Sequence, residues 1–213
     1  MIEVNRRQLL LGGVASVAAS GVVASDAVAA RAGETFIDTF AANQGHWVDT
    51  VGAWGVRAGR LVSASSATDA TLHSVRTRER YGRFTLAARV RHVGRGSTSF
   101  IAFGNPAHRS GTGEWGPSYR LGYTRTGMVY VVKIGADHHR TLLLGPVADA
   151  AVDPGGWNEV KIVAVVGYQS IQINGGTFHV TTDSQLSRGY IGMTGQGRRS
   201  VTMVDQVRVD HLG

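Results

Sequence analysis

A polar, glycine-rich segment between two strand-like runs carries many of the residues in this sequence that could do chemistry. Residues 103–123 read FGNPAHRSGTGEWGPSYRLGY. The segment holds a set of aromatic and hydrogen-bonding side chains: His108, Arg109, Glu114, Trp115, Tyr119, Arg120 and Tyr123. Sugar binding needs aromatic faces that stack on apolar sugar faces, and polar groups that fix hydroxyls. The segment is therefore a candidate carbohydrate-binding site.

The same segment can also be a plain connector that ends in a core strand. Successive side chains of a strand point to opposite faces, so Tyr119 and Tyr123 share the face of Leu121. These tyrosines are then expected in the core, with Trp115 covering its rim. Arg120 points the other way, to the open side. Arg120 and the loop residues are therefore the stronger functional candidates.

Candidate groups elsewhere in the chain are few. Trp47, in an early Gly-His-Trp loop, is a second candidate for an exposed aromatic residue. His138 and His139 follow Asp137, but neighbouring strand residues point to opposite faces and cannot easily share one metal ion. A polar hairpin tip is favoured over a zinc site, because no third ligand is placed nearby. There is no Ser/His/Asp motif and no phosphate-binding glycine loop.

The elements that must position these residues are strands. After residue 34, about twelve short apolar or alternating runs are separated by Gly, Asn, Asp or Pro every 8–12 residues. The run 84–91 alternates between apolar and polar residues, which is typical of a strand with one buried face. Asn174-Gly175 between two such runs predicts a tight hairpin. The pattern predicts an all-β fold, a two-sheet antiparallel jelly-roll sandwich.

The first 30 residues resemble an export signal with a twin-arginine character. Arg6 and Arg7 precede an apolar run that starts at Leu9. The small residues 27–29 offer a cleavage site, after Ala29 or Ala30. Glycine and serine interrupt the run, which argues against a membrane-spanning helix and against stable membrane insertion after signal removal. We expect a secreted or cell-envelope protein.

Residues 31–213 are enough for one domain with a real core. The chain has no cysteine and a net charge of +7, so an exported form would rely on its core, with or without a bound ion. One local basic cluster lies at Arg76, Arg78, Arg80 and Arg83. No nucleic-acid-reading motif accompanies it, so a solvated basic face is favoured over nucleic-acid binding.

Short motifs spread over this domain resemble the concanavalin A-like lectin and glucanase group, which includes laminin-G-like domains and the bacterial 3-keto-disaccharide hydrolase (DUF1080) type. Their order and spacing carry the resemblance more than any single motif. The motifs are FIDTF at 36–40, WGVRAGRL at 54–61, GRFTL at 82–86, GWNEVKI at 156–162, IQING at 171–175, GYIGM at 189–193 and VDQVRV at 204–209. The resemblance implies the jelly-roll fold and a link to carbohydrates.

The resemblance also implies what cleavage would require. Retaining β-glucanases of this fold carry two carboxylates four residues apart on one strand face, about 5 Å from each other. Here Glu114 stands alone, and Asp149 and Asp153 lie in a turn-like DAAVDPGG stretch. In the keto-sugar hydrolase type an acid follows the tyrosine at the position of Tyr119, where this sequence has Arg120. The catalytic pattern is therefore incomplete.

A structural calcium ion is a further implication, because this fold often holds one near its paired terminal strands. Asp38, Asp205 and Glu34 are the acids placed for it. The alternative is that Asp38 and Asp205 hydrogen-bond turn amides, since calcium wants 6–8 oxygen ligands.

The sequence favours a secreted carbohydrate-binding protein that does not cleave its ligand. An enzyme of the 3-keto-disaccharide hydrolase type is the first alternative. A protein-binding adhesion module is the second, and an exposed apolar patch of several hundred Å² would favour it.

Overall fold

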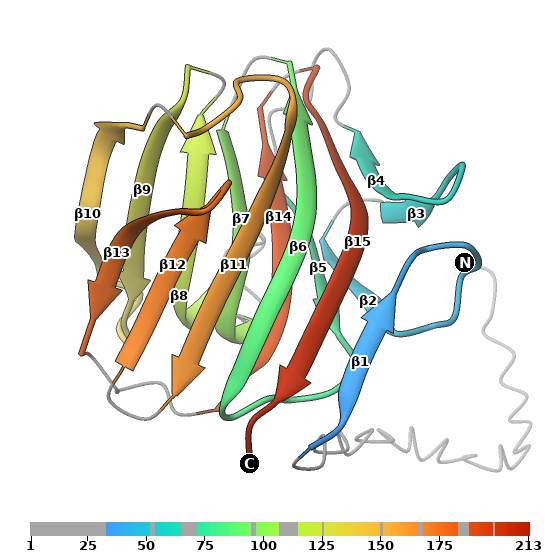
Figure 1. Ribbon diagram of the computed structural model, residues 1–213, viewed down its shortest axis with the longest axis horizontal. Helices are drawn as coiled ribbons and strands as arrows, with labels where there is room; N and C mark the ends of the chain where they lie inside the picture. The colour runs from blue at the N-terminus through green and yellow to red at the C-terminus, as the bar shows by residue number, and fades with distance from the viewer. Residues whose placement is uncertain are drawn as a thin grey trace, which may run out of the picture.

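A computed structural model gives the fold of the chain (Figure 1). It describes residues 33–51, 54–64, 72–94, 97–106, 115–124, 126–149, 151–165, 168–182, 188–197 and 199–213. The expected export signal lies outside these residues. The described residues form fifteen strands and no helix. No membrane-crossing helix is therefore found among them.

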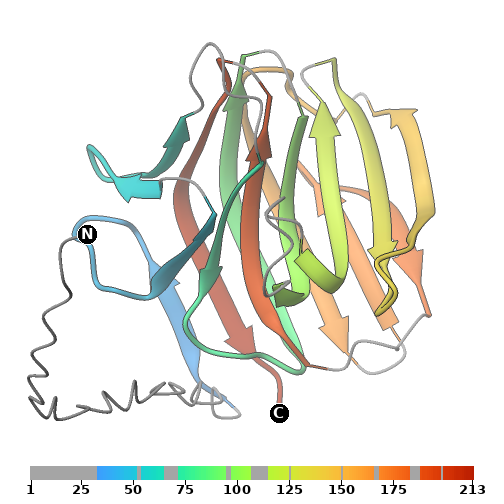
Figure 2. The same cartoon turned by 180° about the vertical axis from the view of Figure 1, so that it is seen from behind.

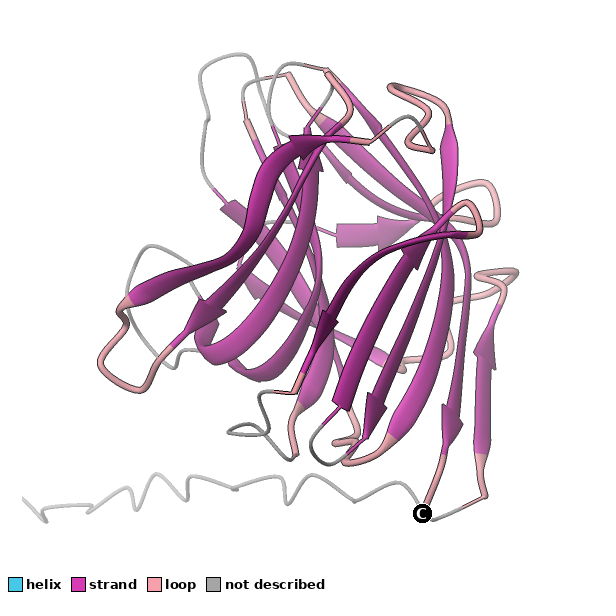
Figure 3. Cartoon of the chain, turned by 60° about the vertical axis from the view of Figure 1, so that its left-hand side comes forward, coloured by secondary structure: helices cyan, strands magenta, loops and turns pink. Residues whose placement is uncertain are grey.

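The strands form two antiparallel sheets packed face to face, seen edge-on in Figure 3. The seven-stranded sheet faces the viewer in Figure 2. Its strands, in sheet order, are β10 (Arg140–Ala148), β9 (Met128–Ile134), β8 (Trp115–Thr124), β7 (Ser97–Pro106), β14 (Tyr190–Gln196), β5 (Leu72–Thr77) and β2 (Trp47–Val51).

The eight-stranded sheet lies in front in Figure 1. Its strands, in sheet order, are β13 (Gly176–Thr181), β12 (Tyr168–Ile173), β11 (Trp157–Val165), β6 (Phe84–Val93), β15 (Val201–His211), β4 (Leu61–Ala64) and β3 (Trp54–Val56), with β1 (Thr35–Asp38) paired to β15. The first and last strands of the domain therefore pair, as the family resemblance implied. The jelly-roll sandwich expected from the strand pattern is confirmed.

Local sequence accounts for these strands. In β6, Phe84, Leu86 and Val90 are fully buried, while the alternate positions face outward. The hairpin between β12 and β13 turns at Asn174 and Gly175, whose φ angles of 48° and 83° are the positive values that the turn requires. The Asn174 side chain also donates hydrogen bonds to Asn158 and to the Ala151 carbonyl, which anchors the turn.

The core lies between the sheets and includes a buried tyrosine hydroxyl. The Phe84 and Phe103 rings, from opposite sheets, have centroids 4.8 Å apart. Tyr123 is fully buried. Burial raises the pKa of its hydroxyl to about 12, while the nearby Asn158 side chain and His92 backbone act in the opposite direction. Asn158 and His92 belong to the eight-stranded sheet.

Candidate functional site

The segment singled out from the sequence is more strand-like than expected. β7 continues to Pro106 and β8 begins at Trp115, and these two residues pair across the ladder. The register of the two strands shifts between Gly104 and Pro106. The ladder thus ends at Pro106, which has no backbone N–H to donate. Both strands therefore extend further into the polar segment than the sequence pattern indicated.

The loop residues of the predicted site are outside the described structure. His108, Arg109 and Glu114 fall in the segment 107–114. Only the backbone of Trp115 is described. The ligand-binding role expected for these four residues stays a prediction.

The tyrosines of β8 point into the core, as expected. Phe103 packs against Phe84 of the opposite sheet, so its face of the seven-stranded sheet is the inner one. Tyr119 pairs with Phe103 and shares that face. Tyr119 is 5% exposed and Tyr123 is fully buried. Both tyrosines are therefore structural residues.

Arg120 lies on the outer face, but it does not reach open solvent. Alternation with Tyr119 places it there, yet only 6% of the residue is exposed. Ser118 and Thr194, which alternation also places on this face, are fully buried. The expectation that Arg120 projects into an open side was therefore wrong, because the outer face is itself covered around β8 and β14.

The strand registers align two arginines across this outer face. Arg76 of β5 pairs with Gly192, which pairs with Ala102 of β7, which pairs with Arg120 of β8. Three strand spacings of about 4.8 Å separate the two arginine backbones by about 14 Å. Two of the smallest residue types, Gly192 and Ala102, occupy the positions between them.

Tyr130 supplies an aromatic surface beside Arg120. It pairs with Gly122, which is two residues from Arg120 and therefore on the same face. A side-chain carbon built at Gly122 would collide with the Tyr130 ring, so the ring lies directly over this glycine. Tyr130 is half-buried. A ring held against the sheet in this way is a suitable platform for the apolar face of a sugar.

Tyr190 is the second aromatic residue of the outer face, and two arginines contact it. The Arg76 guanidinium lies 4.0 Å from the centroid of the Tyr190 ring, and that of Arg80 lies 5.6 Å away. Arg76 also donates a hydrogen bond to the Thr77 carbonyl oxygen at 2.9 Å. Burial lowers the pKa of Arg76, the Tyr190 hydroxyl opposes this, and Arg78 lowers it further.

Acidic residues are nearly missing from the strands of this sheet. Its strands contain Arg76, Arg120, Lys133 and Arg140, whereas their one acid is Asp49 in the edge strand β2. Cleavage by a retaining mechanism needs two carboxylates about 5 Å apart. The described strands of the seven-stranded sheet offer no such pair.

Trp47 is a structural residue and not the exposed aromatic that was expected. Its indole Nε1 donates a hydrogen bond to Asp38 Oδ2 at 3.0 Å, and its ring packs near Phe36 and Phe40. Asp38 is 2% exposed, and its Oδ1 accepts a hydrogen bond from the Phe40 amide at 2.7 Å. The carboxylate thus holds a turn in which Phe40 adopts a φ of 55°.

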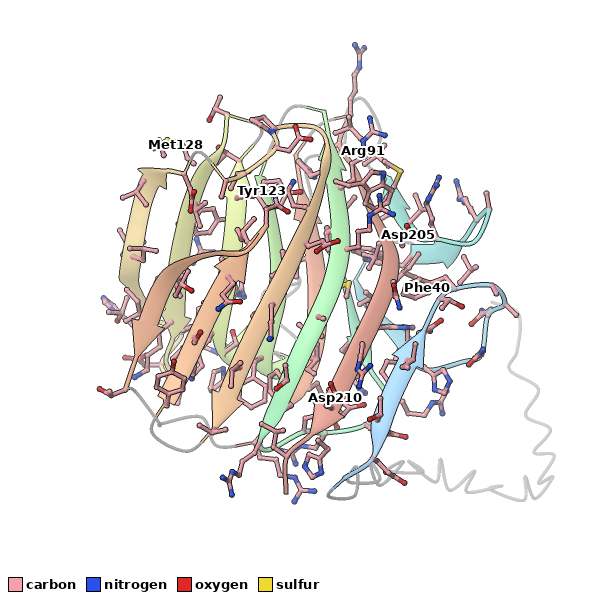
Figure 4. All side chains as sticks on the ribbon, in the orientation of Figure 1. Phe40, Arg91, Tyr123, Met128, Asp205 and Asp210 are labelled. Atoms are coloured by element: carbon pink, nitrogen blue, oxygen red, sulfur yellow. The ribbon has the colours of Figure 1, made fainter. Side chains whose placement is uncertain are left out.

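Asp205, the other acid considered for calcium, faces two arginines. Its carboxylate lies 2.9 Å from Arg89 Nη1 and 3.8 Å from Arg60 Nε, and both guanidinium groups also contact the Trp157 ring. Figure 4 places Asp205 on β15. Two neighbouring cations disfavour a divalent ion. Among the described residues no group of three or more Asp, Glu, His or Cys side chains could hold a metal. Calcium binding therefore stays a prediction.

A shallow groove of about 390 Å³ crosses the outer face of the eight-stranded sheet. Ala87 and Lys161 are among its lining residues, together with Arg89 and Arg208. Both arginines have acid partners, because Arg89 pairs with Asp205 and Arg208 forms three hydrogen bonds with Asp210. These pairs neutralise the arginine charge on this side.

Three residues on the outer face of the seven-stranded sheet were not assigned to the site from the sequence. Tyr130 and Tyr190 lie in ordinary strand patterns, and Arg76 belongs to a cluster expected to be solvated. A partial signal exists for Tyr130, because its position in MVYVVKI places it opposite to the buried Val129 and Val131. No local pattern predicts that Arg76 meets Tyr190, since the strand pairing alone brings them together.

Solved structures show that this architecture is shared with carbohydrate-binding modules and glycosidases. A carbohydrate-binding module CBM66 from Bacillus subtilis matches with 13% identity, 75% of this chain, 92% of that chain and a TM-score of 0.57. A β-1,3-1,4-glucanase from a mouse hindgut metagenome matches with 14% identity and a TM-score of 0.60, covering 83% of this chain and 98% of that chain. An endo-acting O-glycanase structure from the human gut microbiota matches with 14% identity and a TM-score of 0.63, covering 84% of this chain and 99% of that chain. At these identities the likeness concerns the fold.

The family follows from the sequence itself. The family model described as a 3-keto-alpha-glucoside-1,2-lyase-like domain matches residues 33–210. The chain therefore belongs to this family. No curated protein matches the sequence. The protein is thus a carbohydrate-binding or glycosyl hydrolase-like β-sandwich.

Proposed function

We propose that this protein binds a glycan on the outer face of the seven-stranded sheet and does not cleave it. The observation that carries the proposal is the composition of that face. Tyr130 and Tyr190 offer aromatic rings, Arg76 offers hydrogen-bond donors, and six of the seven strands contain no acid. Aromatic rings and donors support sugar binding, whereas cleavage needs a placed pair of acids.

Binding to a polysaccharide panel by the full chain tests the proposal, with Tyr130→Ala as the site variant. Losing the ring over Gly122 is expected to weaken binding roughly tenfold, which corresponds to about 1.4 kcal/mol. Trp115→Ala is the companion variant, because Trp115 starts the same strand as Arg120.

Tyr168→Ala is the matched control. Tyr168 is an exposed tyrosine, 42% accessible, on β12 of the opposite sheet. It should leave binding unchanged. Equal losses in Tyr130→Ala and Tyr168→Ala would reject the outer face of the seven-stranded sheet as the binding surface, and no binding by the parent chain would reject the function.

A lyase or hydrolase acting on 3-keto-glycosides is the second candidate, and family membership favours it. Elimination next to a ketone requires a base that removes a proton from the adjacent carbon. His108 and Glu114 are the candidates from the predicted loop. Turnover of a 3-keto-glucoside by the parent chain, lost in Glu114→Gln or His108→Ala, would establish this activity. Turnover that survives simultaneous loss of Arg109, Glu114 and Arg120 would exclude these residues as its machinery.

Export by the twin-arginine route is proposed with this function, because a glycan-binding protein meets polysaccharides outside the cell. Replacing Arg6 and Arg7 together by Lys should retain the protein in the cytoplasm, as followed by fractionation. Unchanged export in this variant would argue for the general route.

A protein-binding adhesion role has less support. The described large apolar residues that are exposed are Ile37, Leu142, Val147, Tyr168 and Leu212. They belong to β1, β10, β12 and the C-terminal end, so no single strand pair carries them all.

A further inference from the structure

The groove on the outer face of the eight-stranded sheet has a small floor between long side chains. Ala87 of β6 pairs with Lys161 of β11 on one side and with Arg208 of β15 on the other. These three strands lie next to one another in the front sheet of Figure 1. Two strand spacings of about 4.8 Å therefore separate the Lys161 and Arg208 backbones by about 10 Å, with only a methyl group between them. The alanine thus accounts for the hollow of about 390 Å³.

A second row of polar side chains runs beside the first. Arg89 pairs with Glu159 of β11 and with Gln206 of β15, and all three line the groove. Each lies two residues along its strand from a member of the first row, so both rows project from the same face. Gln172 of β12 adds a further amide beside Lys161, with which it pairs. Donors and acceptors therefore surround the alanine floor.

The two arginines of the groove are restrained by partners at its border. Arg208 forms three hydrogen bonds with Asp210 through Nε and Nη2. Arg89 donates to Asp205 at 2.9 Å, and its guanidinium lies 5.1 Å from the centroid of the Trp157 ring. Side chains that are already held lose less conformational freedom when a ligand binds. The border of the groove is thus partly pre-organised.

Three further groups of the groove can serve a ligand directly. Within the described part of the chain, the side chains of Glu159, Lys161 and Gln206 form no hydrogen bond or ion pair, and all three are exposed. They supply a charged acceptor, a charged donor and an amide that does both. A hydroxyl group also donates and accepts, so a mixed set of this kind suits a ligand rich in hydroxyls.

The charges in and beside the groove balance. Three basic and three acidic side chains are involved, so the local net charge is zero: Arg89, Lys161 and Arg208, with Glu159, Asp205 and Asp210. Attraction of a polyanion requires an excess of positive charge. A neutral ligand is therefore favoured at this groove.

We propose that this groove is a second glycan-binding site, which binds a neutral sugar chain through its hydroxyls. The inference rests on the proposed glycan-binding function and adds a site on the opposite sheet. The two sites face away from each other across the sandwich (Figure 3). One molecule then holds two chains at once and cross-links neutral polysaccharides, which a single site cannot do.

NMR titration of the full chain tests the site with neutral tetrasaccharides from dextran, laminarin, xylan and mannan, and with a polygalacturonate fragment as the acidic comparison. We expect a neutral tetrasaccharide to shift the amide signals of Ala87 and Lys161. The corresponding polysaccharide should form turbid, cross-linked complexes with the parent chain.

Ala87→Ile is the test variant, because it fills the floor with a residue that strands favour. It should weaken binding at the groove at least tenfold and abolish the turbidity. Ala148→Ile is the matched control, since Ala148 is an exposed alanine in the edge strand β10 of the other sheet. It should change neither result. Glu159→Gln keeps the shape of the groove and should weaken binding there roughly tenfold, as expected for a charged hydrogen bond.

The outcomes separate this inference from the proposed function. Glycan binding with unchanged affinity and turbidity in Ala87→Ile and Glu159→Gln would overturn the second site and leave the first intact. Binding lost in Ala87→Ile but kept in Tyr130→Ala would support the groove and reject the face of the seven-stranded sheet. Equal losses in Ala87→Ile and Ala148→Ile, or shifts in the groove with polygalacturonate alone, would overturn the neutral-glycan site. Binding of no saccharide would overturn both proposals.

Discussion

The guanidinium of Arg76 lies 4.0 Å from the centre of the Tyr190 ring, in a contact between neighbouring strands of the seven-stranded sheet. Cation–π contacts of this kind hold an arginine in one orientation while its edge donors stay available. The pair lies on the outer face, in line with Arg120 three strands away. It marks one end of the proposed glycan-binding face.

Removing the Tyr190 ring should weaken glycan binding, because the ring holds the Arg76 guanidinium in place. Tyr190→Leu loses a contact worth about 0.5–2 kcal/mol, so a roughly 2- to 30-fold weaker Kd is expected by calorimetry. Tyr190→Phe keeps the aromatic face and should bind nearly as well as the parent. An equally weak Tyr190→Phe would assign the effect to the hydroxyl and not to the ring.

Gly122→Ala should impair binding by moving Tyr130. A methyl group at this position collides with the ring, which must then leave the surface of the sheet. We expect a loss of glycan affinity close to that of Tyr130→Ala, measured on the same polysaccharide. The double variant should be no weaker than either single one, because both changes remove the same platform. Additive losses would contradict the proposed role of Gly122.

Asp38 should matter far more for stability than Asp205. Asp38→Ala leaves the Trp47 indole and the Phe40 amide without their acceptor in a buried turn, so the free energy of unfolding should fall by about 2 to 4 kcal/mol. Asp205→Ala breaks a solvent-accessible ion pair and should cost less than about 1 kcal/mol. Urea denaturation measures both. A similar cost for the two variants would contradict the structural role given to Asp38.

Stability should fall at high pH because of the buried tyrosines. The pKa of Tyr123 is raised to about 12 from an unfolded value of about 10. The stabilisation by the neutral hydroxyl is therefore fully present below pH 10 and is lost between pH 10 and 12. Its size is about 2 to 3 kcal/mol. Burial also raises the pKa of Tyr81, so Tyr81 contributes in the same direction.

Urea denaturation between pH 9 and 12 measures this loss, and Tyr123→Phe is the informative variant. Its stability should decline less steeply over this range, with Tyr81 accounting for the remaining decline. An unchanged slope in Tyr123→Phe would show that the Tyr123 hydroxyl does not titrate differently in the folded state.

Calcium removal should leave the thermal midpoint unchanged. The Asp38 carboxylate is engaged by two protein donors, and that of Asp205 faces two guanidinium groups. A bound ion would raise Tm by mass action. Scanning calorimetry in EGTA and in millimolar calcium distinguishes the two cases, with magnesium as the control. A calcium-specific increase in Tm would confirm the calcium site expected from the sequence.

Local sequence signals were enough to predict the sandwich. Alternation predicted β6, because a strand on a core buries every second residue. Asn174-Gly175 predicted its hairpin, because both positions need positive φ. The exposure of Arg120 and Trp47 was mispredicted, because alternation assigns a side chain to a face and does not tell what covers that face. Trp47 turned inward since Asp38, nine residues earlier, offers an acceptor for its indole.

The sequence by itself determined the all-β architecture, the buried tyrosines of β8 and the lack of a local carboxylate pair, since each depends on neighbours along the chain. The tertiary structure alone decided the candidate site. Arg76 and Tyr190 meet only because β5 and β14 pair, and Tyr130 covers Gly122 only because β8 and β9 pair. Strand order in a sheet is set by long-range packing of the whole core, and no short stretch of sequence encodes it.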